Sequence, residues 1–394
     1  MKTMTKGQAN SSANLLDACV HCGLCLNECP TYRLTGNEAN SPRGRLQQWK
    51  AIDENRIDAD QSTDFYADQC VGCLACESIC PSKIEYGQLL EQYRHEQVAS
   101  GRGNLDWKLT LMAKVLDKPK LLNALSFPIR LLRTTTGFPH QMIFPGKPHL
   151  FTSTSQYASQ LNKRYNPTGP KVALFTGCIM ESFFREVNFA TVRALVKNNI
   201  RVVIPNDQVC CGAFYTHTGQ GPSLNLEQKN QNALSATDCD LLLTNSSGCG
   251  LQLAKSFAST GVKVQDVSGY LGELELKKLE QKKTNHKLFV DLPCHLVHGQ
   301  KVSGISDSVL DATGYDWELA PNADHCCGAG GSYNIQQPEN SREILKKKAG
   351  FLNDLPANLK ITIATSNHIC MMQWNMAKPM VNKSFDVKHI VQLL

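Results

Sequence analysis

The stretches CVHCGLCLNECP at residues 19–30 and CVGCLACESICP at residues 70–81 decide how this chain folds. Each holds four cysteines with the spacing C-x2-C-x2-C-x3-C, followed directly by a proline. Cysteines two residues apart on a tight loop can surround three corners of a cubic metal cluster, while backbone N–H groups point at its negative sulfurs. The region around them is small and polar, so we expect bound metal to supply much of its folding energy.

The same spacing binds cubane [4Fe-4S] clusters in ferredoxins, where the fourth cysteine of each run ligates the other cluster. The predicted ligands of one cluster are Cys19, Cys22, Cys25 and Cys80, and those of the other are Cys70, Cys73, Cys76 and Cys29. Zinc sites and disulfides are the alternatives. Zinc usually takes two pairs of ligands and stops at four, which would leave the third cysteine of each run unused.

Length and composition indicate a globular chain of two or three domains, with 394 residues and 17 cysteines. The first 18 residues contain no apolar segment typical of a secretory signal, so we expect thiolates that bind metal rather than disulfides. No apolar run reaches the roughly 18 residues of a spanning helix. The expected location is the cytoplasm. The alternative is peripheral contact with the cytoplasmic face of the inner membrane.

The formal net charge of +6 does not indicate a nucleic-acid-binding protein. Two oxidised cubane clusters with four thiolates each carry about −2 apiece, which brings the folded protein near neutrality. The lysines and arginines are also scattered rather than gathered in a stripe with aromatic residues between them. We therefore expect no nucleic-acid partner.

Helices are predicted at residues 45–55 and 84–98 from their apolar periodicity. Residues 105–133 are basic and amphipathic, which is typical either of a helix on a membrane surface or of a linker packed on a partner or on the next domain. Pro119 and Pro128 are expected to interrupt this stretch, which favours the linker. A loop rich in proline and glycine is predicted at residues 137–148.

From residue 171 onward the chain repeats itself. The first copy contains KVALFTGC, RVVIPNDQVCCG and DLLLTNSSGC, and the second contains KLFVDLPC, WELAPNADHCCG and ITIATSNHIC. The same number of residues separates the first cysteine from the cysteine pair in both copies. The repeated cysteines are Cys178, Cys210, Cys211 and Cys249 in the first copy and Cys294, Cys326, Cys327 and Cys370 in the second.

Short apolar runs alternate with helical stretches in each copy, which predicts an α/β fold with mostly parallel sheets. Each of these cysteines follows an apolar run, and ligands of open α/β sheets collect beyond the carboxyl ends of the strands. Four cysteines that are distant in sequence can therefore converge on one site in each copy. We predict four parts: a mostly helical two-cluster domain at 1–100, a helical linker at 101–169 and two α/β repeats at 170–285 and 286–394.

The adjacent cysteines of each repeat can point two thiolates at one metal centre. Gly212 and Gly328 follow the two pairs and let the backbone turn close to that centre. Cys239 belongs to no motif, and we expect it to be structural.

The two ferredoxin runs and the repeated cysteines together resemble a known family. The repeated cysteines resemble the duplicated "CCG" domain of heterodisulfide reductase subunits. Two ferredoxin runs followed by two such domains, with SPRGR at residues 41–45, resemble the iron-sulfur subunits of bacterial glycolate oxidases. This resemblance implies a partner subunit that binds FAD and oxidises a 2-hydroxy acid, while this chain relays electrons to a quinone or another acceptor.

The repeats depart from the CCG pattern at two positions. That pattern ends in C-x-x-C, but Ser246 and Asn367 stand where its first cysteine is expected. The sites could then hold a [4Fe-4S] cluster or zinc, or one could be empty. His295 and His368 could complete a site in the second repeat, although a histidine beside a cysteine is more often merely packed.

Three functions are compatible with these motifs. We expect an electron-transfer subunit of a glycolate dehydrogenase, because several cluster sites occur without a flavin or nicotinamide fingerprint. Subunits for lactate or glycerol 3-phosphate share this architecture. A heterodisulfide-reductase-like enzyme acting at the CCG site, or a zinc-containing scaffold, are the other classes.

Overall fold

The computed structural model describes residues 15–103, 106–136, 149–276 and 285–394 of this protein. The loop predicted at 137–148 lies outside these residues. Contacts group the chain into two compact units rather than four, so the predicted domain boundaries stay predictions. The N-terminal unit comprises Met1–Thr110, Phe214–Pro222 and Gly328–Ile344, and the repeat unit comprises Leu111–Ala213, Ser223–Cys327 and Leu345–Leu394.

The cysteine-rich part of the N-terminal unit is built from short helices. They are α2 (Leu24–Glu28), α3 (Pro30–Thr35), η1 (Glu38–Asn40), α4 (Pro42–Asp53), α5 (Gln61–Asp68), α6 (Ala75–Ser78) and α7 (Tyr86–Ala99). Helix α4 begins three residues before its predicted start, because the Ser41 side chain caps it by accepting a hydrogen bond from Gly44 N at 3.0 Å.

A small aromatic core joins these helices. Trp49 stacks on Tyr86 and on Tyr93, with ring centroids 5.5 and 5.3 Å apart. Cys70 and Cys76 belong to the same buried cluster of side chains. Two predicted metal ligands are therefore also part of this small, mostly aliphatic and aromatic core.

Two short segments from the repeats belong to the same unit. Gln69 Nε2 donates to Gln337 Oε1 at 3.0 Å, and Arg94 Nη1 donates to His217 O at 3.5 Å. Both segments begin directly after, or within three residues of, the cysteine pair of their repeat.

The basic region forms α8 (Trp107–Leu116) and α9 (Pro119–Thr136), and α10 (Thr154–Tyr165) follows. Pro119 separates the first two helices, as expected. The expectation that Pro128 would also end a helix is wrong, because α9 continues through it. Pro128 lies on the exposed side, where water can hydrate the carbonyl of Ala124 that loses its hydrogen bond. No helix within the described residues is long and apolar enough to cross a bilayer.

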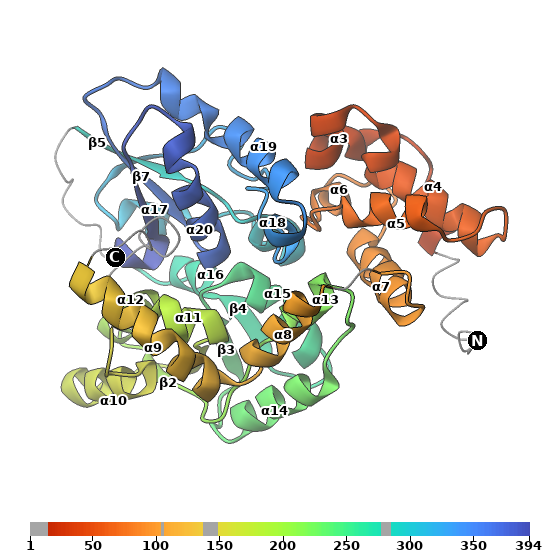
Figure 1. The fold of residues 1–394 in the computed structure, drawn as a ribbon. Coiled ribbons are helices and arrows are strands. Elements are labelled where there is room, and N and C mark those ends of the chain that lie inside the picture. The colour runs from red at the N-terminus through yellow and green to blue at the C-terminus, as the bar shows by residue number, and fades with distance from the viewer. Residues whose placement is uncertain (1–14, 104–105, 137–148, 277–284) are drawn as a thin grey trace. The chain divides into compact units, whose positions relative to one another are not determined.

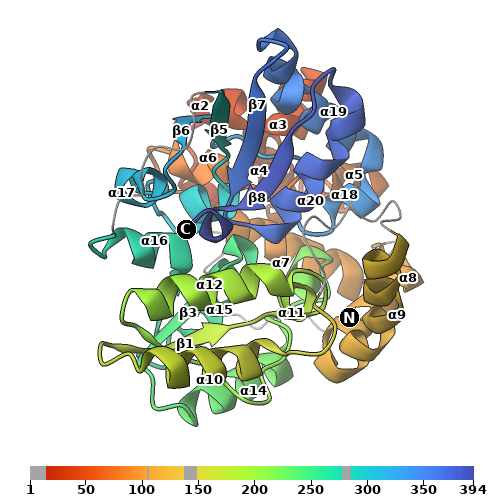
Figure 2. The ribbon, with the colours of Figure 1, turned by 90° about the vertical axis from the view of Figure 1, so that its left-hand side faces the viewer.

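The two repeats form two four-stranded parallel sheets with the same strand order, β2-β1-β3-β4 and β6-β5-β7-β8 (Figures 1 and 2). This confirms the predicted α/β class and the repeat. The first repeat contains β1 (Lys171–Phe175), α11 (Cys178–Phe183), α12 (Arg185–Lys197), β2 (Arg201–Val203), α13 (Ala213–His217), α14 (Leu224–Ser235), β3 (Leu241–Thr244), α15 (Ser247–Phe257), β4 (Lys263–Asp266) and α16 (Val267–Gly272). The second contains β5 (His286–Val290), η3 (His295–Gly299), α17 (Asp307–Asp311), β6 (Asp316–Leu319), α18 (Tyr333–Gln336), α19 (Pro338–Ala349), η4 (Gly350–Asp354), β7 (Lys360–Thr365), α20 (His368–Met376), η5 (Lys378–Met380), β8 (Asp386–His389) and η6 (Ile390–Gln392).

Alternating residues of the central strands point to opposite faces of each sheet. Val172 and Leu174 of β1 join a buried cluster with residues of α12, and the same cluster continues through Leu288 and Ile363 of the second sheet. One hydrophobic core therefore runs through both repeats and fixes how they face each other. The segments that follow β3 and β7 therefore lie next to this shared hydrophobic core.

His389 is one of the contacts between the repeats. Its ring is fully buried, Nε2 lies 3.0 Å from Asn245 O, and Nδ1 lies 3.4 Å from Val391 N. A neutral ring with its proton on Nε2 satisfies both contacts, whereas a protonated Nδ1 would face another donor. Burial lowers the pKa of His389 to about 4.

We expect the contact through His389 to weaken in acid. The pKa of His389 lies below its unfolded value of about 6.5, so the unfolded state binds more protons and stability falls as pH decreases from about 6.5 towards 4. Between pH 7 and 5 the group should contribute about 2 kcal/mol of this loss. Urea unfolding of wild type and His389→Gln at both pH values measures it, and an equal pH dependence of the two proteins would contradict the assignment.

Candidate functional site

Both ferredoxin runs have left-handed backbone at the same two positions of the loop. These are His21 (φ 54°) and Gly23 (φ 80°) in the first run and Gly72 (φ 71°) and Leu74 (φ 64°) in the second. Left-handed residues that alternate with right-handed ones turn successive N–H groups towards one side and make an anion-binding nest. The Gly72 N–H already donates to Cys70 Sγ at 3.4 Å. Each loop can therefore stabilise the negative charge of a cluster.

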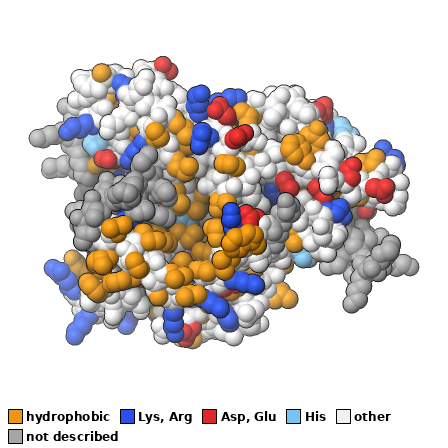
Figure 3. Space-filling view, in the orientation of Figure 1, with side chains coloured by type: hydrophobic (Ala, Val, Ile, Leu, Met, Phe, Trp, Pro, Cys, Tyr) orange, Lys and Arg blue, Asp and Glu red, His pale blue; other side chains and the backbone are white. Residues whose placement is uncertain are grey.

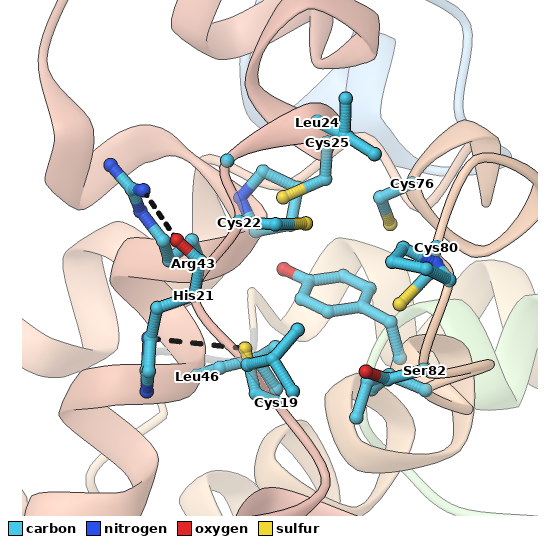
Figure 4. Close-up of a pocket in the computed structure, with 16 residues that line it drawn as sticks. Cys19, His21, Cys22, Leu24, Cys25, Arg43, Leu46, Cys76, Cys80 and Ser82 are labelled. Atoms are coloured by element: carbon cyan, nitrogen blue, oxygen red, sulfur yellow. Dashed lines mark hydrogen bonds between the residues drawn. The ribbon is translucent and has the colours of Figure 1, made fainter.

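The structure brings Cys80 of the second run to the first three cysteines of the first run. Cys19, Cys22, Cys25 and Cys80 line one pocket (Figure 4). Cys76, Leu46, Ile84 and Tyr86 also line it, so its wall is largely apolar. Burial raises the pKa of the Cys25 thiol to about 11, so metal binding there has to displace a proton. This grouping is compatible with the crossed ligand sets, which stay a prediction.

Cys29 lies with the predicted ligands of the second cluster, Cys70, Cys73 and Cys76. It is buried near Cys70, and burial raises the pKa of its thiol while Arg45 opposes that rise. Thr31 Oγ1 lies 3.2 Å from Cys29 Sγ, and the Tyr86 hydroxyl donates to Cys70 Sγ at 3.6 Å. Hydroxyl groups thus approach two sulfurs of this group, where they can stabilise negative charge.

Arg45 is a buried charge beside the ferredoxin cysteines that the sequence motifs did not predict. Its side chain is fully buried, with Nε donating to Tyr66 O at 2.6 Å and Nη2 to Thr31 Oγ1 at 3.3 Å. Burial alone would lower the pKa of Arg45, but the neighbouring Tyr86, Cys70 and Cys29 raise it above its ordinary value. A buried guanidinium beside thiolates neutralises part of the charge of a cluster. Its only sequence signal was its place in SPRGR between the two runs.

The four cysteines of the first repeat meet at the carboxyl ends of its strands. Cys178 begins α11, the pair Cys210 and Cys211 follows β2, and Cys249 lies in the first turn of α15. Cys178 Sγ and Cys210 Sγ are 3.7 Å apart, and Cys211 contacts both Cys210 and Cys249. Contact with Cys210 and burial raise the pKa of the Cys178 thiol, whereas contact with Cys211 lowers the pKa of Cys249.

The second repeat brings its cysteines together in the same way. Cys327 Sγ lies 3.5 Å from Cys370 Sγ, and the charge of Cys294 acts on Cys370. Contact with Cys327 and burial raise the pKa of Cys370. The structure thus places Cys327 and Cys370 together with Cys294 near them, and the role of the repeat cysteines as ligands stays a prediction.

A buried ion pair distinguishes the second site. Lys348 Nζ lies 2.6 Å from Asp291 Oδ1 and also donates to Ala323 O and His325 O, just before the cysteine pair. Burial alone would lower the pKa of Lys348, but Asp291 and Cys327 raise it. In the first repeat Asn230 of α14 contacts the cysteine pair, since its Nδ2 donates to Cys210 O at 3.0 Å. Sequence reasoning missed Lys348, which lies within a run of three lysines.

The surroundings of the repeat cysteines fit an iron-sulfur cluster. Four hydroxyls beside them are buried and lack a hydrogen-bond partner within the described residues: Thr244 Oγ1, Ser247 Oγ, Thr365 Oγ1 and Ser366 Oγ. Hydroxyl donors of this kind can bond to cluster sulfurs. Gly212 (φ 89°) and Gly328 (φ 85°) adopt the left-handed turn expected after each pair.

The remaining predicted residues lie at the edges of these sites. His368 is buried, its pKa is lowered to about 3 by burial, and its ring meets that of Phe184 at 5.6 Å, which is compatible with packing. The ring of His295 lies against Gly248, next to Cys249 of the other repeat. Cys239 is buried and its thiol contacts Thr237 O at 3.6 Å. Whether either histidine is a ligand stays a prediction.

Known protein families match the N-terminal cysteine-rich region and both repeats. Residues 15–84 match the 4Fe-4S dicluster domain family, and residues 172–254 and 290–375 match the cysteine-rich domain family. No solved structure matches the chain.

Similar proteins cover most of the chain. A probable glycolate oxidase iron-sulfur subunit of Bacillus subtilis is 28% identical over 95% of this chain and 92% of its own length. The glycolate oxidase iron-sulfur subunit of Escherichia coli is 28% identical over 92% of this chain and 90% of its own. One subunit of the dihydromethanophenazine:CoB–CoM heterodisulfide reductase of Methanosarcina mazei is 24% identical over 82% of this chain and 80% of its own.

The order of the domains, the grouping of the cysteines and the extent of these similarities agree. The chain therefore resembles the glycolate oxidase iron-sulfur subunits and matches one 4Fe-4S dicluster domain and two cysteine-rich domains.

Proposed function

We propose that this chain is the electron-transfer subunit of a glycolate dehydrogenase. A partner subunit that binds FAD removes a hydride from the 2-hydroxy acid, and this chain carries the electrons one at a time towards a quinone or another acceptor. The similarity to two glycolate oxidase iron-sulfur subunits over more than 90% of the chain supports this proposal. The lack of a flavin or nicotinamide fingerprint explains the need for a partner.

One observation carries the proposal: four groups of cysteines occur in one chain, each with charge-stabilising groups around it. Iron-sulfur clusters, when bound, take up and release single electrons. The protein holds the sulfurs, excludes water and stabilises added negative charge with Arg45, Tyr86 and Lys348. We propose two [4Fe-4S] clusters at the ferredoxin runs and one further cluster in each repeat.

Burial weighs against a catalytic role of the cysteine pairs. Cys210, Cys211, Cys326 and Cys327 expose between 2 and 6% of their surface, so an external disulfide does not reach them in this conformation. A relay requires no such access. Lactate or glycerol 3-phosphate remains the alternative substrate of the complex, because this chain offers no site that reads the substrate.

We further propose that α9 contacts a membrane surface, where a quinone acceptor would be reached. The polar side chains Ser126, Arg130 and Arg133 of this helix are buried, and α9 packs against α11. In contrast, Leu121 and Leu125 are exposed by 41 and 55%. The helix thus buries both of its arginines and exposes several leucines, the reverse of an ordinary surface helix.

Neighbouring side chains extend this apolar surface, which we call the α9 face (Figure 3). It consists of Leu111, Met112, Leu121, Leu125 and Phe151. Exposed lysines accompany it at positions 114, 118 and 120, and α8 and α9 contain no acidic residue. An apolar surface flanked by lysines fits an anionic lipid surface, in which the side chains enter the headgroup region and the lysines meet phosphates.

The isolated chain should show a reducible brown chromophore and should not oxidise glycolate, because it relays electrons without binding substrate. Anaerobic purification, quantification of iron, zinc and sulfide, and EPR of the reduced protein measure the number and type of clusters. Glycolate turnover by the chain alone would contradict the proposal. Zinc with little iron in the repeats would instead support a scaffold.

Exchange of the fourth cysteines should reveal the crossed ligand sets. We expect Cys80→Ser to remove or alter the EPR signal of the cluster held by Cys19, Cys22 and Cys25, and Cys29→Ser to alter the other one. Cys239→Ser is the matched control, since it should leave both signals unchanged. Loss of the same cluster signal in both variants would contradict the crossed arrangement.

Binding to lipid vesicles should depend on the α9 face. Each lysine near an anionic surface contributes about 1 kcal/mol, so replacing Lys114, Lys118 and Lys120 with Gln should weaken binding on the order of a hundredfold. Leu121→Gln with Leu125→Gln should also weaken it. Sedimentation with vesicles of anionic and of neutral lipid measures both effects.

The matched control replaces Leu224 and Leu319, which are exposed leucines elsewhere, with Gln. It should bind vesicles as wild type does. The membrane proposal is wrong if the wild-type protein does not bind vesicles. If the Leu121 and Leu125 variant then also fails to assemble with the flavoprotein, the α9 face is a subunit interface.

A further inference from the structure

Ser246 and Asn367 occupy equivalent places in the two repeats, three residues before the last cysteine of each. Both stand at the N-cap position of a helix, α15 and α20, with extended backbone. Serine and asparagine are favoured there because their side chains accept hydrogen bonds from the first turn. Neither side chain caps its helix here. Both are instead directed elsewhere.

The two side chains meet each other. Ser246 Oγ donates to Asn367 Oδ1 at 3.2 Å, and both residues are buried. Asn367 Nδ2 donates to Cys370 Sγ at 3.5 Å. On the other side Ser246 contacts Cys249, and the pKa of that thiol is lowered by contact with Cys211 and with Ser246. A short polar chain therefore runs from Cys249 through Ser246 and Asn367 to Cys370.

Neighbouring backbone contacts hold Ser246 and this row of hydrogen bonds in place. Gln300 Nε2 donates to Ser247 O at 2.8 Å, and His389 Nε2 contacts Asn245 O at 3.0 Å. Both contacts tie the segment after β3 to the other repeat. The meeting of Ser246 and Asn367 is therefore fixed by the backbone on both sides of Ser246 and does not depend on the two side chains alone.

We propose that Ser246 and Asn367 form a bridge through which an electron at one repeat site changes the reduction potential of the other. The proposal rests on the proposed function, which places redox-active clusters at both sites. The two residues are positioning residues, since they act through the cysteines that they contact.

The coupling follows from the single proton of the Ser246 hydroxyl. It can be donated either to Asn367 Oδ1 or to Cys249 Sγ, but not fully to both. An added electron at the first site makes Cys249 Sγ more negative and attracts this proton. Asn367 Oδ1 then loses its donor, and its amide donates less strongly to Cys370 because linked hydrogen bonds strengthen one another. A weaker hydrogen bond to sulfur makes the second site harder to reduce.

The unequal residues are suited to this task. An asparagine accepts at Oδ1 and donates at Nδ2, so it can pass the effect on to Cys370. A second serine would have only one proton for both partners. No proton leaves the bridge, because the Ser246 hydroxyl only reorients while an electron enters or leaves.

Potentiometric titration followed by EPR tests the bridge in the complete, cluster-containing chain. Ser246→Ala should lower the potentials of both repeat sites, since one loses a donor directly and the other loses support for Asn367. Asn367→Ala should lower the potential of the second site and raise that of the first, because Ser246 is then free to donate to Cys249. We expect changes of about tenfold in the reduction equilibrium, or about 59 mV for one electron.

Ser246→Thr keeps the hydroxyl and should retain the wild-type potentials. If Ser246→Ala does not fold, the test compares the potentials of Ser246→Thr with those of Asn367→Ala. Ser256→Ala is the matched control, since Ser256 is a buried serine of α15 whose hydroxyl donates within its own helix, to Gln252 O. If each variant moves only the site of its own repeat, the bridge is wrong while the electron relay stands. If iron analysis finds no cluster in the repeats, both the bridge and the proposed cofactors fail.

Discussion

The whole structure depends on holding sixteen of seventeen cysteines at least partly buried in the protein. Burial opposes ionisation and raises the pKa of thiols such as Cys25, Cys29 and Cys76, yet metal ligation requires thiolates. The chain offsets this conflict with fixed positive groups. Left-handed loops direct N–H groups inward at the ferredoxin runs, and Arg45 and Lys348 bring full charges to the interior. Each of these two charged groups is held by several hydrogen bonds, so its geometry does not depend on the bound metal alone.

The duplication preserved the scaffold and changed the chemistry placed on it. Strand order and the positions of the cysteines are the same in both repeats. The groups around them differ, since the neutral Asn230 contacts the cysteine pair of the first repeat, whereas Lys348 and Asp291 form an ion pair next to the pair of the second repeat. Because the two sheets share one core, both sites are carried by the same packed unit.

The sequence predicted the parts of this protein that are local or periodic. Regular cysteine spacing, alternating β and α segments and the repeat itself indicated the fold class and the grouping of the cysteines. Arg45 and Lys348 could not be found in this way, because an arginine on a short helix and a lysine in a charged run usually face solvent. The reversed orientation of α9 was equally hidden, since amphipathic spacing does not reveal which face is buried. The pairing of residues 214–222 and 328–344 with the N-terminal unit depends on contacts between residues far apart in sequence.

That pairing has a consequence for biosynthesis. A ribosome releases the chain from its amino end, and domains generally fold as soon as they are complete. The cysteine-rich unit is not complete after residue 110, because it also requires residues up to Ile344. It can close only when nearly all of the polypeptide has been made, so the interval for loading iron and sulfide extends through translation of both repeats.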